Sequence, residues 1–90
     1  MRVAVVIPCF NDGARLDQAV ASALAQTHQD IEIWVVDDGS TDPDTRRLLE
    51  SYRRPKTKVL RQEHAGVSRA RNRVIEETTA PLILNLDADD

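Results

Sequence analysis

The sequence predicts an α/β fold in which a parallel sheet is built in the order βαβαβαβ. Four short apolar segments, rich in β-branched residues, are spaced along the chain, and each is joined to the next by a segment with helical periodicity. Because every connection carries a helix, consecutive strands run parallel through right-handed crossovers. The ninety residues, 1–90, therefore form one Rossmann-like unit, too small for a second domain.

The first strand is expected at Val3–Ile7, a β-branched run that ends before Pro8 and suits a strand buried on both faces. A helix is expected from Asp12 onward, with Asn11 or Asp12 as its cap. Its apolar residues recur at the spacing of one helical face, and they are Leu16, Ala19, Val20, Ala23 and Leu24.

The second strand is expected at Ile31–Val36, closed by the turn-forming "DDGS". A helix follows in "TDPDTRRLLESY", because Asp42 can accept backbone N–H bonds at its start and Pro43 has no N–H to lose there. The side chains expected to face inward from this segment are Leu48, Leu49 and Tyr52.

The last three elements are a short strand in "TKVLRQ", a helix in "GVSRARNRVIEET" and a strand in "PLILNLD". The side of the helix expected to face the sheet carries Val67, Ala70, Val74, Ile75 and Thr78. The side expected to face solvent carries Arg69, Arg73 and Glu76. The final strand would leave a sheet edge open, so we expect self-association through it.

Composition excludes several classes of protein. Apolar residues make up 41% and charged residues 30%, which is typical of a folded globular chain. A net charge of -3 argues against a nucleic-acid partner. Cys9 is the only cysteine, so an intramolecular disulfide is excluded, and a small buried filler is its expected role.

Targeting signals are also missing from the sequence. The apolar run before Pro8 is too short for the core of a secretion signal, and no stretch approaches the ~20 apolar residues of a membrane span. A cytoplasmic location is therefore expected. His28 and His64 have no partner at metal-ligand spacing, so a loop or surface position is expected for both.

Polar residues gather where each predicted strand ends. The four strands are followed by "PCFND", "DDGSTD", "QEHAG" and "DADD", whereas the opposite ends carry plain "QDIE", "PKTK" and "TTAP". In open parallel sheets, ligands bind at the carboxyl ends of the strands, where helix N-termini also gather. The sequence therefore predicts a binding site at this edge.

A strand order of 3-2-1, with the fourth strand beside the first, would bring Asn11, Asp38, Asp87 and Asp89 together. Carboxylates brought this close repel one another unless a cation lies among them or some of them are protonated. Mg²⁺ or Mn²⁺ is the expected cation, because hard divalent ions take carboxylate oxygens. The structural alternative is an ordinary "DDGS" turn, a solvated "DADD" and a solvated Arg71.

Four ordered blocks carry a resemblance to a known family: "VVIPCFNDGARLDQAVASALAQT", "IEIWVVDDGSTD", "GVSRARN" and "LILNLDADD". Together they resemble the donor-binding half of the family 2 glycosyltransferases, inverting enzymes of the A-type glycosyltransferase fold, over essentially all ninety residues. The resemblance implies that the region from Pro8 through Cys9 to Asn11, and Asp38, contact the nucleotide, with Asp37 as a neighbour.

The resemblance also implies a metal site in the family's Asp-any-Asp motif. Asp89 would hold the ion that bridges the diphosphate, Asp87 would lie nearer the ribose or a metal-bound water, and Arg71 would lie near the base or phosphates. The implied donor is a nucleotide diphosphate sugar, expected to be a UDP-sugar. The general base and the acceptor site would lie beyond Asp90, so we expect these ninety residues to bind donor without transferring sugar.

Three alternatives stay open at this point. A dinucleotide-dependent oxidoreductase shares the sheet, but "PCFNDG" offers one glycine where three are expected. An aspartate-based phosphoryl-transfer domain would leave "DDGSTD" and "SRARN" without a role. A non-catalytic nucleotide-binding module of the same fold is the third alternative.

Overall fold

The computed structural model describes residues 1–25 and 30–86, and its elements alternate as the sequence predicts. The strands are β1 (Val3–Cys9), β2 (Ile31–Asp38), β3 (Thr57–Gln62) and β4 (Leu82–Asn85). The helices between them are α1 (Gly13–Leu24), α2 (Pro43–Glu50) and α3 (Val67–Glu77).

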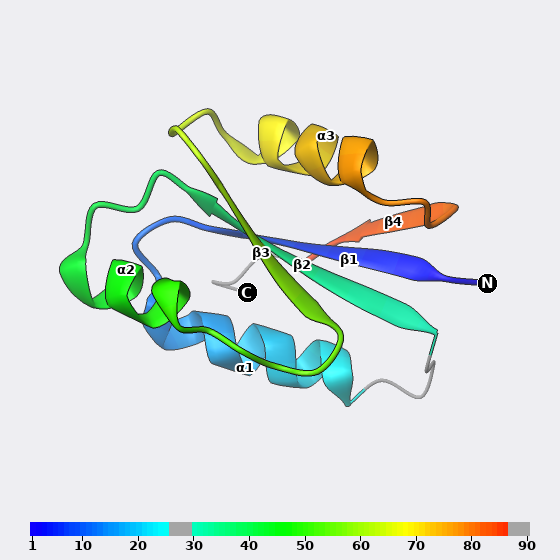
Figure 1. Cartoon of the computed structure of the whole chain (residues 1–90), viewed down its shortest axis with the longest axis horizontal. Coiled ribbons are helices and arrows are strands. Elements are labelled where there is room, and N and C mark those ends of the chain that lie inside the picture. Colours follow the sequence, from blue (N-terminus) through cyan, green and yellow to red (C-terminus); the bar gives the residue numbers. More distant parts are fainter. Residues whose placement is uncertain (26–29, 87–90) are drawn as a thin grey trace.

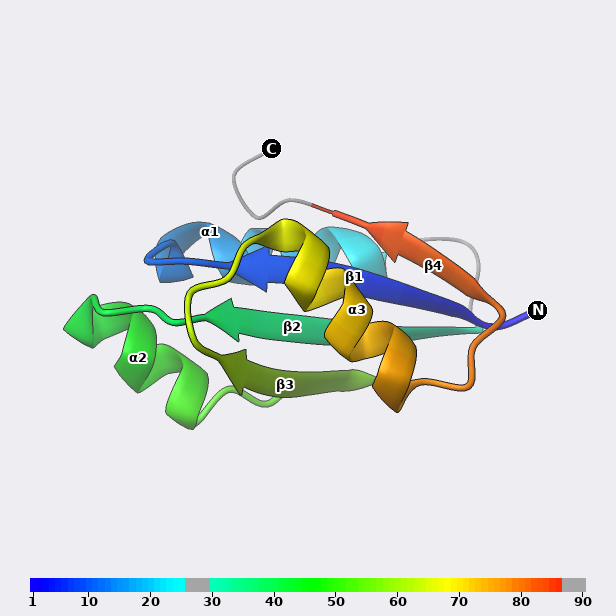
Figure 2. The same ribbon diagram turned by 90° about the horizontal axis from the view of Figure 1, so that it is seen from above.

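The four strands form one parallel sheet in the order β3-β2-β1-β4, which confirms the predicted order. All four arrowheads point the same way in Figure 2, so the loops after the strands leave from one edge. Val5 is aligned with Ile33 of β2 and with Leu84 of β4, which places β1 in the interior of the sheet.

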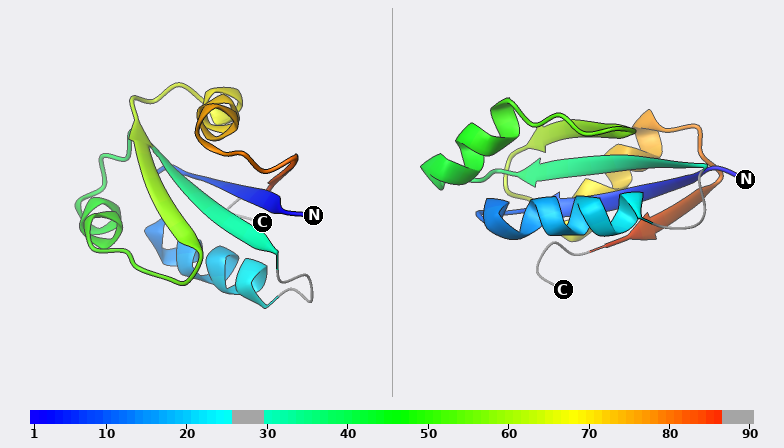
Figure 3. Two further views of the ribbon diagram at one scale, coloured as in Figure 1. Left: turned by 45° about the vertical axis from the view of Figure 1, so that its right-hand side comes forward. Right: turned by 90° about the horizontal axis from the view of Figure 1, so that it is seen from below.

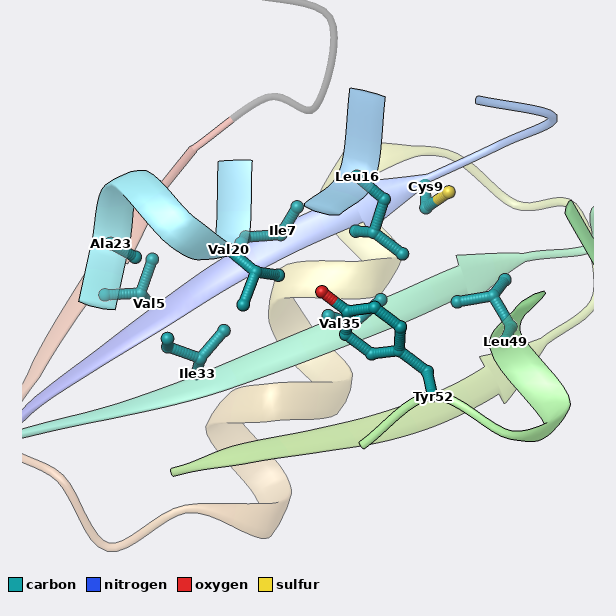
Figure 4. Close-up of a cluster of buried hydrophobic side chains, with 10 residues drawn as sticks. All are labelled: Val5, Ile7, Cys9, Leu16, Val20, Ala23, Ile33, Val35, Leu49 and Tyr52. Carbon is teal, nitrogen blue, oxygen red and sulfur yellow. The ribbon is translucent and has the colours of Figure 1, made fainter. Parts of the chain in front are cut away.

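Helices α1 and α2 cover one face of the sheet and α3 covers the other (Figures 1 and 3). Alternate strand residues divide between the two faces, as the two-residue period of a strand requires. The core under α1 and α2 is drawn in Figure 4, and its buried residues are Val5, Ile7, Cys9, Leu16, Val20, Ala23, Ile33, Val35, Leu49 and Tyr52. The core is therefore built from the inner faces of both helices and of β1 and β2.

The core under α3 is smaller. Its buried residues are Ala4, Val6, Trp34, Val36, Ala70 and Val74. The expectation that Val67 and Ile75 face inward is wrong, since their side chains are 50% and 47% exposed. An 11-residue helix over a narrow sheet presents one row of side chains, and here that row is Ala70 and Val74, four residues apart.

Pro8 lies inside β1 and does not end it, so the expected end at Ile7 was too early. The N–H of Val3 donates to Asp30 on the β2 side, and the carbonyl of Val6 accepts from Leu86 on the β4 side. Backbone groups alternate along a strand, so the nitrogen of Pro8 faces the β4 side, where the last aligned pair among the described residues is Val6 and Asn85. No aligned pair among those residues needs an N–H from Pro8.

Two further boundaries bear on the site. Strand β2 extends through both aspartates, because Asp37 and Asp38 are aligned with Arg61 and Gln62 of β3. Helix α2 begins as predicted: Asp42 Oδ2 accepts from the Thr45 N–H at 3.0 Å and from its hydroxyl at 2.9 Å. Strand pairing therefore holds the end of β2, and the Asp42 cap holds the start of α2, on either side of the loop of residues 39–42.

Strand β4 is at one end of the sheet, with Leu82 and Leu84 about half exposed. Self-association through this edge stays a prediction. Within residues 1–25 and 30–86, no helix has the length and apolar character needed to cross a membrane.

A pair of valines on α3 tests the packing of this helix. Val74→Ala, at a fully buried position, is expected to lower the free energy of unfolding by about 2 kcal/mol, because it removes two buried methyl groups and leaves a cavity. Val67→Ala, at a half-exposed position of the same helix, is the matched control and is expected to change it by less than about 0.5 kcal/mol. Urea unfolding measures both, and equal losses would contradict the assigned helix face.

Candidate functional site at the carboxyl edge of the sheet

The loops after β1, β2 and β3 lie at the same edge of the sheet, as the sequence predicts (Figure 2). We call residues 10–12, 39–42 and 63–66, together with the strand ends that carry them, the rim. Hydrogen bonds between these loops, described below, hold the rim together.

Asn11 connects the first loop to the second. Its Oδ1 accepts from the backbone N–H groups of Thr41 and Asp42 at 2.7 and 2.8 Å, and its own N–H donates to Ser40 Oγ at 3.0 Å. Its backbone has φ of 53°, a left-handed conformation that asparagine tolerates better than most residues. Asn11 therefore fixes the spacing between the loops that follow β1 and β2.

The start of α1 differs from expectation because Asn11 is committed elsewhere. Asp12 occupies the cap position, but its side chain makes no capping hydrogen bond. The N–H of Gly13 donates instead to Thr45 Oγ1 of α2 at 3.1 Å. The two helices are thus joined at their N-terminal ends, and the expected side-chain cap of α1 by Asn11 or Asp12 was wrong.

Asp37 is buried and supports the second loop. Its Oδ1 accepts from the Ser40 N–H at 2.9 Å, and Arg61 Nε lies 4.0 Å from its Oδ2. The carboxylate therefore closes the turn on which Ser40 meets Asn11.

Asp38 is 5% exposed and connects the second loop to the third. Its Oδ1 accepts from Gln62 Nε2 and from the Ala65 N–H, both at 2.8 Å, and its Oδ2 accepts from the Gly66 N–H at 3.1 Å. Burial raises the pKa of the Asp38 carboxyl, but these hydrogen bonds and the nearby His64 outweigh burial and set the pKa below its ordinary value. Asp38 is therefore held as a carboxylate.

Gly39 lets the second and third loops touch. Its φ is +74°, and a Cβ at this position would lie 2.6 Å from the backbone nitrogen of His64. A side chain here would meet both backbone strain and a steric clash. Glycine is therefore required for the observed approach of the two loops.

Phe10 and His64 form an exposed aromatic pair at the rim, and sequence reasoning did not predict that they pair. Their ring centroids are 4.4 Å apart, and His64 Nδ1 lies 3.1 Å from the Asp38 carbonyl oxygen and 3.2 Å from its Oδ2. Phe10 is 44% exposed. Their positions directly after β1 and β3 could have indicated that the two side chains lie at the same edge. His64 was expected to lie on a loop or at the surface, and it does.

The remaining predicted residues are placed less centrally. Cys9 is buried against α1, and burial raises the pKa of its thiol, so its side chain is core filler, as expected. Pro8 is partly buried in β1. Arg71 is exposed in the second turn of α3, and its guanidinium makes no hydrogen bond or ion pair with another described residue.

The predicted metal ligands Asp87 and Asp89 lie outside the described residues. Among residues 1–25 and 30–86, no group of three or more His, Cys, Asp or Glu side chains is arranged to hold a metal ion. Strand β4 is parallel to β1, so the chain leaves β4 toward the rim just before Asp87.

Two hollows at the rim are lined by described residues. One, of about 480 Å³, is lined by Gly39, Arg61, Gln62, Glu63 and His64. The other, of about 340 Å³, lies between the starts of α1 and α2 and is lined by residues 11–14, 42, 44, 45 and 48. Both hollows are largely open to solvent, so they are depressions in the rim rather than enclosed cavities.

Comparison with known proteins identifies relatives over the whole chain. The sequence pattern of the family described as Glycosyl transferase family 2 matches residues 4–90. An uncharacterized glycosyltransferase of Nostoc sp. is 40% identical over 92 residues, covering 100% of this chain and 29% of the relative. Chondroitin synthase of Escherichia coli is 36% identical over 89 residues, covering 98% of this chain and 13% of the relative.

A solved structure shows the same fold. It is a mannosyltransferase from Pyrobaculum calidifontis in complex with GDP-Man and Mn²⁺, with a TM-score of 0.77 and 26% identity, covering 97% of this chain and 27% of that one. The present chain thus spans less than a third of the length of each of these three proteins.

The lowered pKa of Asp38 predicts an acid-sensitive contribution to stability. The unfolded carboxyl titrates near its ordinary value of 3.8 and the folded one below it, so the contribution is fully present above that value and is lost as pH falls through the folded pKa. The difference in free energy of unfolding between wild type and Asp38→Asn is expected to shrink between about pH 6 and about pH 3. Urea titrations at several pH values measure it, and a constant difference would contradict the assignment.

Two substitutions at Asn11 test separately the contributions of its side chain and of its left-handed backbone conformation to stability. Asn11→Gly removes the bonds to Thr41 and Asp42 and is expected to cost about 1 kcal/mol, whereas Asn11→Ala adds left-handed strain and is expected to cost about 1 kcal/mol more. Thermal or urea unfolding gives both values. Asn72→Ala, on the exposed side of α3, is the control; a loss there as large as that of Asn11→Ala would refute the role given to Asn11.

Proposed function

The chain belongs to glycosyltransferase family 2, and from this premise we propose that its rim binds the nucleotide diphosphate of a sugar donor. The observation that carries the proposal is the joining of three loops at one edge of a parallel sheet, where ligands of such sheets bind. The sugar transfer itself is proposed for a protein of which this chain is the donor-binding part.

The rim offers surfaces suited to the parts of a nucleotide. Phe10 and His64 are exposed at the rim, and aromatic side chains can stack on bases. Arg71 has no charged partner among the described residues, so its guanidinium is available to a phosphate. We assign the base to the side of Phe10 and His64, near Pro8, Cys9 and Asn11 in the chain.

A divalent ion completes the proposed site. Asp87 and Asp89 would hold Mn²⁺ or Mg²⁺, since adjacent carboxylates in an Asp-any-Asp pattern suit hard cations. The structural neighbour was solved with Mn²⁺ and GDP-Man, which supports a metal and a nucleotide sugar in this fold. When bound, such an ion would neutralise charge on the departing diphosphate.

The finer assignments rest on the sequence. An inverting reaction needs a general base opposite the leaving group. We propose that this base and the acceptor site belong to a longer protein, since the chain spans less than a third of its relatives. We propose a UDP-sugar as donor, and GDP is the natural competitor to test because the neighbour's complex contains GDP-Man. We further propose that the ninety residues alone bind donor without turning it over, and that they act in the cytoplasm.

Calorimetry with uridine diphosphate and guanosine diphosphate, each with and without Mn²⁺, tests the proposal. Binding is expected with Mn²⁺ and is expected to weaken at least about tenfold, or 1.4 kcal/mol, in Asp89→Asn, because a carboxylate ligand is lost. Glu76→Gln removes one negative charge on the exposed side of α3 and is the matched control, expected to bind as wild type. Equal losses from both substitutions, or no nucleotide binding by wild type, would reject the proposed site.

A further inference from the structure

We propose that the chain docks on anionic membrane surfaces through a basic surface along strand β3 and helix α3. We call the side chains of Arg53, Lys58, Arg69 and Arg73 the basic edge. Its partner is the headgroup layer of a membrane that contains acidic phospholipids, to which the chain is held by charge. The inference goes beyond the proposed function, because it uses none of the residues assigned to the donor.

Positive charge is concentrated in one part of the sequence. Residues 53–73 contain eight Lys and Arg and one Glu, whereas the remaining residues contain four Lys and Arg and fourteen Asp and Glu. The net charge of -3 therefore combines a strongly basic segment with an acidic remainder. Charge asymmetry of this kind is typical of chains that bind membranes or other polyanions.

The fold places the basic edge on the side of the sheet that α3 covers (Figure 2). Lys58 Nζ lies 5.0 Å from the ring centroid of Trp34, whose side chain packs in the core under α3. Arg73 Nη1 donates to the Arg61 carbonyl of β3 at 3.1 Å, which holds that side of α3 against the strand. Arg69 lies one helical turn before Arg73, so it projects from the same side of the helix.

A shallow hollow connects β3 to the loop before it. The hollow has a volume of about 480 Å³, and its lining includes Arg53, Lys58 and Trp34 as well as Glu77 from the end of α3. Strand β3 is an outer strand of the sheet, so this surface faces solvent along the edge. Glu77 is the acidic residue in the lining, and its single charge does not cancel those of the basic edge.

The cations of the basic edge are not neutralised within the part of the chain that the structure describes. Within residues 1–25 and 30–86, none of the four forms an ion pair with Asp or Glu, and all except the partly buried Arg73 are exposed. Other arginines of the chain do pair: Arg2 lies 3.2 Å from Asp30, and Arg54 lies 2.9 Å from Asp17. Unpaired cations gathered on one surface create a positive potential that attracts polyanions.

A lipid surface fits these features better than a nucleic acid does. The aromatic residues beside the basic edge, Trp34 and Tyr52, are 5% and 4% exposed, so neither ring is available to stack on a base. Acidic headgroups form a layer of negative charge, and each Lys or Arg held near that layer adds to the attraction without a matching cleft. The shallow, open hollow is therefore no obstacle to docking.

Three substitutions remove charge from the basic edge and keep a long polar side chain. They are Arg53→Gln, Lys58→Gln and Arg69→Gln, all at exposed positions, so the variants are expected to fold. Arg46→Gln makes the same chemical change at an exposed position of α2, which covers the opposite face of the sheet, and it is the matched control.

Co-sedimentation with vesicles of phosphatidylcholine, with and without phosphatidylglycerol, measures docking. Binding is expected only with phosphatidylglycerol, and it is expected to weaken at least about tenfold between about 0.1 and about 0.5 M salt, because salt screens the attraction. Each single substitution is expected to weaken binding about fivefold and the triple variant about a hundredfold. Arg46→Gln is expected to bind within about twofold of wild type.

Three results would overturn the inference: no binding to vesicles with phosphatidylglycerol, equal binding to pure phosphatidylcholine, or losses as large in Arg46→Gln as in Lys58→Gln. A short DNA duplex at the same salt concentration is the competing polyanion. Tighter binding to the duplex than to the vesicles, lost in the triple variant, would assign the basic edge to nucleic acid instead. Failure of nucleotide binding at the rim would reject the proposed function and leave the vesicle result standing.

Discussion

Parallel pairing of the four strands is the constraint on which the rest of this structure depends. Because β1 lies between β2 and β4 and all four strands point one way, the loops that follow β1, β2 and β3 lie at the same edge. Residues far apart in the chain are therefore brought together there: Asn11 bonds to Thr41, and His64 lies beside Asp38. The position of the site therefore follows first from the direction of the strands and only then from the side chains on the loops.

The second requirement is that the carboxylates buried at this edge have hydrogen-bond donors. Asp37 and Asp38 are both nearly inaccessible, and an unpaired buried carboxylate would be strongly unfavourable. Backbone N–H groups of Ser40, Ala65 and Gly66 supply the compensation. In the described part of the chain, every buried side-chain nitrogen or oxygen has a hydrogen-bond partner. The two aspartates thus stabilise the loops that surround them.

Much of this arrangement could be predicted from local patterns. The helical faces of α1 and α2, the Asp42 cap and the strand order follow from spacing and the rules for parallel connections. The errors came where tertiary context decides. Pro8 lies within β1 although it has no N–H to donate, and Val67 is exposed because α3 presents one row to the sheet. No local pattern shows that Asn11 bonds to Thr41 rather than capping α1.

Paramagnetic broadening by Mn²⁺ bound with a nucleotide diphosphate tests the central claim, that the rim is the donor site, most directly. The account predicts that amide signals at the carboxyl edge, those of Phe10, Ser40 and Ala65, broaden first. Amides at the start of the strands, those of Ile31, Thr57 and Leu82, should stay sharp. Broadening of the second group before the first, or of both equally, would contradict the account.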